Sequence, residues 1–311
     1  MENRIPVIMD CDPGHDDAIG LLLANASEKI DVLAVTTCGG NQTVEKTTYN
    51  AQRVCTLLDM NVPIGKGAAR PLTEVPMNAP SVHGKSGLDG PALPEPAYPI
   101  SDLSAIELMA QTIRSADRPV TIVSTGPMTN TAGFLLAHPE LKHKVAQVSM
   151  MGGGIGHGNW TPAAEFNILA DPEAADMVFR SGVPILMAGL DVTEQALIYR
   201  QDIDRIRALG NHVASVVADW IEFFFEFHRQ RGYAGAPLHD PVATAALIAP
   251  ELFQMRELYV QIETQGEFCR GATVGDVNGS TGNAPNARCI MGLDRQGFVD
   301  LLCSAVQTYG R

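Results

Sequence analysis

The chain of 311 residues has few basic side chains, no closely spaced pair of cysteines and no long apolar run. Its net charge of −13 argues against nucleic acids and anionic membranes as partners. The six cysteines form neither a C-x-x-C pair nor a zinc pattern, so we expect free thiols in a reducing compartment. No apolar run reaches the roughly 18 residues of a membrane span, and no basic segment with an apolar core opens the chain. We therefore expect a cytoplasmic protein.

Strand and helix patterns alternate along the chain, which is typical of a mostly parallel central sheet with helices on both faces. We see no internal repeat and no linker, so we predict a single α/β domain over residues 1–311. Buried strands are predicted from apolar runs at 5–9, 31–37, 120–124, 145–151 and 183–188, and later strands at 259–263, 273–277 and 287–291.

One long segment, 66–100, contains seven prolines and shows no clear periodicity. A structureless loop of this length is uncommon unless it serves as a lid or a binding loop. His83 lies near its centre. We therefore expect this segment to take part in ligand binding.

Asp10, Asp12, Asp16 and Asp17 fall within eight residues, between a predicted strand and a predicted helix that contains Ala18 to Ala26. In an open parallel sheet, such a turn at the carboxyl end of a strand is where ligands bind. Four like charges repel one another unless a cation joins them, and Ca²⁺ and Mg²⁺ prefer carboxylate oxygens. Capping of the following helix would explain Asp16 or Asp17, but it leaves the other two without a reason.

Polar residues recur where the other predicted strands end, and the carboxyl ends of parallel strands meet at one edge of a sheet. Taken singly, each has a simpler explanation, because Asn and Asp favour turns and caps. The glycines at 152–156 lack the lysine of a phosphate-binding loop, so phosphate binding is not supported. The recurring polar residues are Asn41, Thr125, Asn159, Glu165, Asn167, Asp191, His239 and Asp240.

The segment Asp10-Cys11-Asp12-Pro13-Gly14-His15-Asp16-Asp17 resembles the N-terminal signature of the inosine-uridine preferring nucleoside hydrolases. The resemblance extends over almost the whole chain. Within the family, the chain resembles the bacterial pyrimidine-preferring subgroup in particular. It implies a Rossmann-like fold. The other matching segments, in order, are Gly40-Asn41-Gln42-Thr43, His83-Gly84, Met151-Gly152-Gly153-Gly154, Ala164-Glu165-Phe166-Asn167 and His239-Asp240-Pro241.

The resemblance implies an enzyme that hydrolyses the N-glycosidic bond of ribonucleosides, with uridine and cytidine as the expected substrates. The transition state of such a reaction gains positive charge on the sugar, which nearby carboxylates would stabilise. By similarity, Ca²⁺ would be held by Asp12, Asp17, Asp240 and the backbone carbonyl of Thr125. Asp12 would act as the general base toward a Ca²⁺-bound water.

The resemblance also implies contacts to the sugar. Such contacts would favour a ribonucleoside over a 2′-deoxynucleoside, because a site built to bond a hydroxyl rejects an analogue that lacks it. Asp10 would orient its neighbours. The residues expected to bind the sugar in this way are Asp16, Asn41, Asn159, Glu165 and Asn167, and Met151 is also expected to bind substrate.

Two histidines are candidates for protonating the leaving base, since imidazole can donate near neutral pH. We expect His239 to be catalytic, because it adjoins Asp240, and His83 to close over the base. His15 is expected to be structural. Tyr233 would either stack on the base or pack on the helix, and the residues leave the role of Arg231 open. The aromatic patch between Phe223 and Phe227 is expected to belong to the core.

Two other functions are compatible with the residues alone. A metal-dependent phosphatase would use an aspartate of an Asp-x-Asp turn as nucleophile, although Gly14 stands where that family has Thr or Val. A nucleoside-binding protein without catalytic activity would need the same metal-binding and sugar-binding residues. The family resemblance further implies a homo-oligomer, a dimer or a tetramer, and the residues leave the preferred base open.

Overall fold

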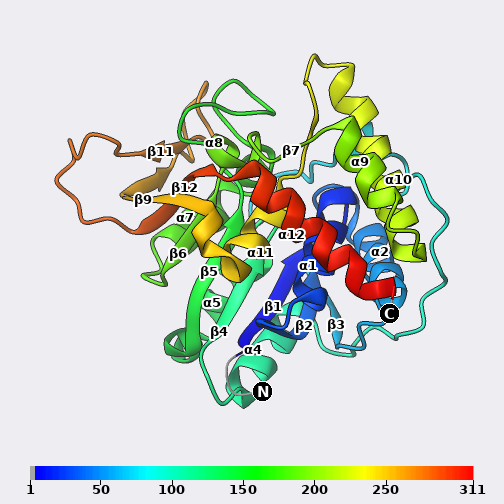
Figure 1. The fold of residues 1–311 in the computed structure, drawn as a ribbon. Coiled ribbons are helices and arrows are strands. Elements are labelled where there is room, and N and C mark those ends of the chain that lie inside the picture. Colours follow the sequence, from blue (N-terminus) through cyan, green and yellow to red (C-terminus); the bar gives the residue numbers. More distant parts are fainter. Residues whose placement is uncertain (1–3, 311) are drawn as a thin grey trace.

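The computed structural model describes residues 4–310, so the predicted domain ends at 1 and 311 lie outside the described residues. Its centre is an eight-stranded sheet with the order β3-β2-β1-β4-β5-β6-β12-β9 (Figure 1). The first seven strands in this order are parallel, and β9 pairs antiparallel with β12 at the edge. The prediction of a single-domain, mostly parallel α/β fold is confirmed.

The strands of the central sheet and of two small antiparallel pairs have the following bounds. The central strands are β1 Ile5–Cys11, β2 Ile30–Thr37, β3 Ile64–Lys66, β4 Val120–Ser124, β5 Val145–Met151, β6 Ile185–Ala188, β9 Phe253–Leu258 and β12 Ala287–Leu293. The small pairs are β7 Leu197–Ile198 with β8 Ala236–Pro237, and β10 Val260–Ile262 with β11 Thr273–Gly275.

The helices lie mostly between consecutive strands, as the alternating pattern predicts. The bounds are α1 His15–Ala26, α2 Val44–Leu57, α3 Pro80–His83, α4 Ala105–Ser115, α5 Thr129–Ala137, α6 Phe166–Ala170, α7 Pro172–Phe179, α8 Leu190–Thr193, α9 Arg200–Arg207, α10 His212–Arg229, α11 Asp240–Ile248 and α12 Arg295–Gln307. Within residues 4–310, no helix has the length and apolar character that crossing a membrane requires.

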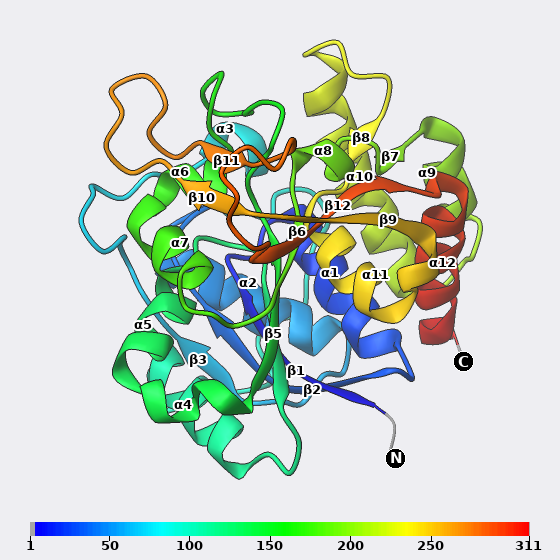
Figure 2. The ribbon, with the colours of Figure 1, turned by 90° about the vertical axis from the view of Figure 1, so that its left-hand side faces the viewer.

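Alternation along the central strands divides the core into two hydrophobic clusters. Val7 and Met9 of β1 belong to one cluster, whereas Ile8 between them belongs to the other. Val123 and Ile122 of β4 divide in the same way, because successive side chains of a strand point to opposite faces. Helices α1, α2, α10, α11 and α12 cover the first face, and α4, α5 and α7 cover the second (Figure 2).

The late β segment is more complex than the sequence predicts. Strands β10, β11 and β12 correspond to the predicted strands at 259–263, 273–277 and 287–291, but β9 was not predicted. Its residues Gln254, Arg256 and Glu257 are exposed, so the segment resembles a surface loop in composition. Edge strands carry such charged side chains because one side faces solvent.

The strand order changes direction beside β1, and this places the candidate site. From β1 the chain continues to β2 and β3 on one side, and it returns to β4, β5 and β6 on the other. The loops after β1 and β4 therefore leave the sheet in different directions and open a crevice at the carboxyl ends of these strands. Asp12 follows β1 and Thr125 follows β4 at this edge.

Candidate active site

A cavity of about 280 Å³ lies at the carboxyl ends of β1, β4 and β5. Its lining residues come from the loops after β2, β4 and β5 and from helices α1, α3, α6 and α10. Figure 2 labels the short helices α3 and α6 among these elements. Every residue predicted to bind substrate lines this cavity, as do Thr125 and Asp240 of the predicted metal site. The residues predicted to bind substrate that the structure brings together here are Asp16, Asn41, His83, Met151, Asn159, Glu165, Asn167, Tyr233 and His239.

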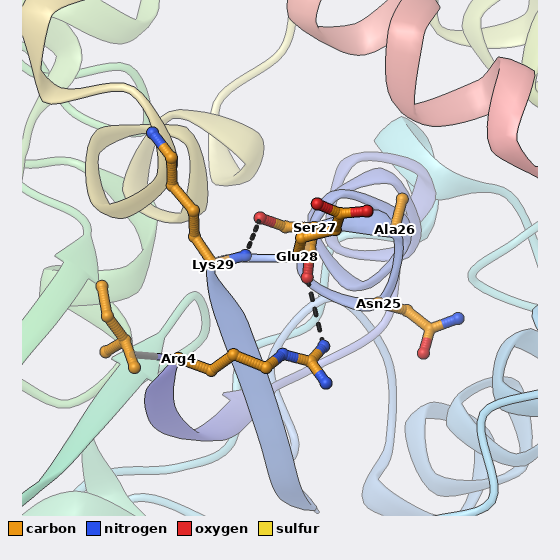
Figure 3. Close-up of a pocket in the computed structure, with 7 residues that line it drawn as sticks. Arg4, Asn25, Ala26, Ser27, Glu28 and Lys29 are labelled. Carbon is orange, nitrogen blue, oxygen red and sulfur yellow. Dashed lines mark hydrogen bonds between the residues drawn. The ribbon is translucent and has the colours of Figure 1, made fainter. Parts of the chain in front are cut away.

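A second hollow, of about 720 Å³, opens where β1 starts and α1 ends, at the opposite end of the strand from the aspartates. Figure 3 shows that its polar groups bond to one another: the guanidinium of Arg4 donates to the carbonyl of Ser27 at 3.2 Å, and the backbone N–H of Lys29 donates to the Ser27 hydroxyl at 3.1 Å. The aspartate cluster is not part of it. We therefore take the first cavity as the candidate site.

Asp17 is the most firmly held of the four aspartates. It accepts hydrogen bonds from the Thr125 hydroxyl at 2.7 Å, from the Gly14 N–H at 2.9 Å and from the side chain of Asn41 at 3.1 Å. The backbone N–H of Asp12 also points to it at 3.3 Å. These donors come from the loops after β1, β2 and β4, so Asp17 links the three loops that form the floor of the cavity.

Asp12 and Asp16 each keep one carboxylate oxygen without a partner. Oδ2 of Asp12 accepts from the backbone N–H of Asn41 at 2.6 Å, but its Oδ1 is buried and unpaired, and so is Oδ1 of Asp16. A buried acceptor without a donor costs about 1–3 kcal/mol, and more when it is charged. Such oxygens indicate that a positive or hydrogen-bonding group belongs beside them.

The distant Asp240 joins this cluster, as the sequence predicts. Carboxylate oxygens of Asp16, Asp17 and Asp240 all lie within 4.8 Å of one another. Asp16, which the sequence assigns to the sugar, is thus also near the place predicted for a metal. The Thr125 carbonyl, a further predicted ligand, accepts from the amide of Asn167 at 2.8 Å, and a carbonyl oxygen has a second lone pair.

Burial and mutual repulsion make it costly for these aspartates to carry charge. Burial, reinforced by the charge of Asp17, raises the pKa of Asp16 to about 7 and that of Asp12 well above its usual value. Burial and the charge of Asp16 do the same to the pKa of Asp240. None of the ion pairs among the described residues involves this cluster. The cluster could hold a metal ion, which would offset the repulsion.

The amide side chains around the cavity have orientations fixed by their neighbours. The Asn41 amide nitrogen donates to the carbonyl of Asp12 at 3.2 Å, and that of Asn167 donates to the carbonyl of Thr125, so both oxygens are left for a ligand. Asn159 is turned the other way, because its oxygen accepts from the Phe166 N–H at 3.0 Å. The three amides therefore offer two acceptors and one donor, a set suited to hydroxyl groups.

Glu165 shapes the loop after β5 and lines the cavity. It is the N-cap of α6, and it accepts from the backbone N–H groups of Gly153 at 2.8 Å, Asn167 at 2.9 Å and Ile168 at 3.1 Å. Burial nevertheless raises its pKa. Because all three donors are backbone groups, Glu165 holds the loop in one conformation and keeps Asn167 facing the cavity.

A chain of hydrogen bonds fixes the proton positions on His83. Nε2 of His15 lies 2.8 Å from the carbonyl oxygen of Asp89, which can only accept, so His15 carries its proton there. Its Nδ1 must then accept from Nδ1 of His83, 3.3 Å away. Neutral His83 therefore presents Nε2 as an acceptor, and burial keeps it neutral by lowering its pKa well below the usual value. His15, which we expected to be structural, sets the tautomer of its neighbour.

His239 has a different environment. Its Nδ1 lies 2.8 Å from the Thr193 hydroxyl, which can donate or accept. When the hydroxyl donates, the imidazole proton sits on Nε2, which then serves as a donor toward the cavity. Burial lowers the pKa of His239 to about 3, so this donor is the neutral ring.

Several lining residues were missed by the sequence analysis. Phe224 is buried in the core as expected, yet it also lines the cavity, as do Phe227 and His228. They lie on one side of α10. Because aromatic residues also occupy the neighbouring positions of this helix, the sequence does not show which positions face the cavity. Trp160 and Glu194 complete the rim.

The two residues whose roles the sequence leaves open are both at the rim. The Tyr233 hydroxyl donates to Glu194, just after α8, at 3.1 Å, and the Tyr233 ring packs edge-on against His228 of α10. The guanidinium of Arg231 lies 3.6 Å from the ring centre of Phe227. Both line the cavity where it opens to solvent.

Comparison with known proteins gives a consistent result. A family model described as inosine-uridine preferring nucleoside hydrolase matches residues 7–300. The pyrimidine-specific ribonucleoside hydrolase RihA of Escherichia coli O127:H6 is 54% identical over 308 residues, which cover 98% of this chain and 99% of the relative. The purine-preferring ribonucleoside hydrolase of Gardnerella vaginalis has a similar structure, with a TM-score of 0.91, 29% identity and 98% coverage of both chains. The plant nucleoside hydrolase PpNRh1 gives a TM-score of 0.89 at 28% identity, covering 97% of this chain and 99% of that one.

The environment of Asp10 generates a test of its charge. Asp10 accepts from the Thr36 hydroxyl and the Asn130 amide, both at 2.8 Å, and from the Thr131 hydroxyl at 3.1 Å. Burial raises its pKa from 3.8 to about 6. The folded state thus binds the proton more tightly than the unfolded state, and stability is lost as the pH rises through 6.

We expect Asp10→Asn to remove this pH-dependent loss of stability. The oxygen of the introduced amide can accept from Thr36 and Asn130, while its nitrogen donates to the Thr131 hydroxyl, which can rotate to accept. In urea unfolding with chelator present, the stability advantage of the variant over the wild type should grow between pH 3.8 and about 6 and level off above, at up to about 3 kcal/mol. Asp31→Asn, at a half-exposed aspartate of β2, is the matched control. A stability difference that does not change with pH would contradict the assignment.

Proposed function

Because the chain belongs to the inosine-uridine preferring nucleoside hydrolase family, we propose that it hydrolyses pyrimidine ribonucleosides to ribose and free base with a bound Ca²⁺ ion. The observation that carries this proposal is the convergence of the buried Asp16, Asp17 and Asp240 beside a cavity that Asp16, Asp240 and three amide side chains line, with unpaired oxygens on Asp12 and Asp16. The pyrimidine preference is supported by the 54% identical relative, which is named a pyrimidine-specific enzyme. Family membership disfavours the phosphatase alternative.

The proposed metal ligands are Asp12, Asp17, Asp240 and the carbonyl of Thr125. The unpaired oxygen of Asp12 and the crowding of Asp17 and Asp240 fit a hard cation that prefers oxygen ligands. When bound, such an ion would lower the pKa of the attacking water. Ca²⁺ is proposed over Mg²⁺ because it accepts more oxygen ligands in a less regular arrangement, including sugar hydroxyls.

The side chains around the sugar supply the remaining catalysis. Asp12, held at one oxygen by the Asn41 N–H, would take a proton from water with its other, unpaired oxygen. The free oxygens of Asn41 and Asn167 would accept from ribose hydroxyls, and the free amide of Asn159 would donate. As positive charge grows on the sugar, Asp16 and Glu165 would stabilise it in a site that excludes water.

The departing base leaves poorly unless it is protonated or hydrogen-bonded, and we propose that His239 stabilises it by donating a hydrogen bond. Its neutral imidazole can present an N–H when the Thr193 hydroxyl donates to its other nitrogen. His83 is less suited to donate, since its Nδ1 proton is directed to His15. We propose that His83 instead contacts the substrate through its free Nε2.

We further propose a cytoplasmic homo-oligomer, a dimer or a tetramer, as the family resemblance implies. The six free cysteines are compatible with a reducing compartment. Light scattering coupled to size-exclusion chromatography measures the assembly directly.

The function is tested by a panel of uridine, cytidine, inosine, adenosine and thymidine, scored for released base by chromatography. We expect uridine and cytidine to be cleaved and thymidine to be slower by about 10⁴, because the site bonds a 2′-hydroxyl that thymidine lacks. Chelator should abolish release and added Ca²⁺ should restore it, with Ca²⁺ binding followed by calorimetry. Preference for a purine, or full activity in chelator, would contradict the proposal.

The role of Asp12 predicts that Asp12→Asn keeps the fold and loses about 10²–10⁴-fold in turnover of uridine, because the proton acceptor is removed. Circular dichroism checks the fold, and calorimetry should show weaker Ca²⁺ binding. Asp31→Asn serves as a control with the same chemical change outside the cavity. Turnover within tenfold of the wild type would exclude Asp12 as the base.

The role of His239 predicts a difference between leaving groups. His239→Ala should slow uridine by about 10²–10⁴-fold, yet barely affect p-nitrophenyl riboside, whose leaving group departs without a proton. His143→Ala, at an exposed histidine away from the cavity, should affect neither substrate. Equal losses on both substrates would remove the acid role from His239.

A further inference from the structure

His228 lies at the C-terminal end of α10, with its side chain buried and lining the cavity. Its Nδ1 is 2.9 Å from the carbonyl oxygen of Phe224, one helical turn earlier. Because a carbonyl can only accept, the proton of the neutral ring must lie on Nδ1. Nε2 therefore carries a lone pair, and it makes no hydrogen bond to any residue that the structure describes. Burial also lowers the pKa of His228 to about 4, so the ring stays neutral.

Three aromatic rings hold the His228 imidazole in place. Its centre lies 4.3 Å from that of Phe224, 5.0 Å from that of Phe227 and 5.3 Å from that of Tyr233, each in an edge arrangement. A ring packed on these sides cannot turn freely, so the direction of Nε2 is fixed. The proposed acid His239 lies 6.4 Å away, measured between ring centres.

The surroundings of His228 differ from those of His83, the other imidazole that offers a bare nitrogen. His83 packs over Gly14, beside Asn41, one of the residues proposed to hold the sugar. His228 comes from α10, whose cavity-lining residues are aromatic or imidazole and include no carboxylate. Flat apolar faces with one fixed acceptor suit a planar heterocycle rather than a sugar.

We propose that His228 determines base specificity: its Nε2 accepts a hydrogen bond from an N–H group on the edge of the pyrimidine, N3–H of uracil or the 4-amino group of cytosine. The inference rests on the proposed function and adds the group that recognises the base. A base without such an N–H would leave His228 unpaired in a buried site, which lowers its affinity. The contact exists before and during bond cleavage alike, so its loss should raise KM more than it lowers kcat.

The experiment compares kcat/KM for uridine, 3-methyluridine and p-nitrophenyl riboside in the wild type, His228→Phe and His228→Gln. The Phe variant keeps the ring packing and removes the acceptor. We expect it to lose about 10- to 100-fold on uridine, mainly through KM, and to stay within about twofold on the other two substrates, which offer no N–H. Gln carries an amide oxygen that can replace the acceptor, so it should recover part of the loss on uridine.

His212→Phe is the matched control, because it makes the same change at an exposed position at the start of the same helix. It should leave all three substrates unchanged, and circular dichroism should show that every variant is folded. Equal losses on all three substrates in His228→Phe, or no loss on uridine, would overturn the inference alone. A wild type that cleaves none of the three would overturn the proposed function and this inference together.

Discussion

Repulsion among Asp12, Asp16, Asp17 and Asp240 is the constraint on which the rest of the site depends. The fold removes these carboxylates from water, which raises their pKa values and makes full ionisation costly. Hydrogen bonds from Asn41 and Thr125 relieve only part of this cost. A bound cation would complete a site of this kind, and its binding energy would also draw together loops that follow three different strands.

The mostly parallel sheet and the place of the aspartates could be predicted from the sequence because both follow from local patterns of apolar and polar residues. Apolar runs such as 120–124 are buried on both faces of a parallel sheet, and their carboxyl ends must share one edge. The edge strand β9 could not be recognised, because its exposed Arg256 and Glu257 carry no strand periodicity. The pattern of apolar residues in a sequence predicts a strand only where at least one whole face of that strand is buried against other elements.

The cavity-lining residues of α10 were harder to predict than the carboxylates and amides that follow the strands. A single Asn or Asp after a strand is explained by a turn or a cap, but their recurrence after several strands makes Asp16 and Asn167 stand out in the sequence. Phe224 and His228 lie in a run of aromatic residues that also fits a helix core, and Phe224 is in fact buried there. Only the three-dimensional structure gives the direction of the hydrogen bond from His228 to the Phe224 carbonyl, and that direction decides which nitrogen is free.

The outer edge formed by β9 has a consequence for how the protein behaves when it is concentrated. An open edge offers unpaired N–H and C=O groups to any extended segment of another molecule. Here charged side chains line that edge, an irregularity between Ile290 and Gly292 interrupts its register with β12, and the Arg256 guanidinium donates to the Val277 carbonyl in a nearby loop. Addition of a foreign strand is therefore disfavoured on this side, which protects the molecule from amyloid-like stacking.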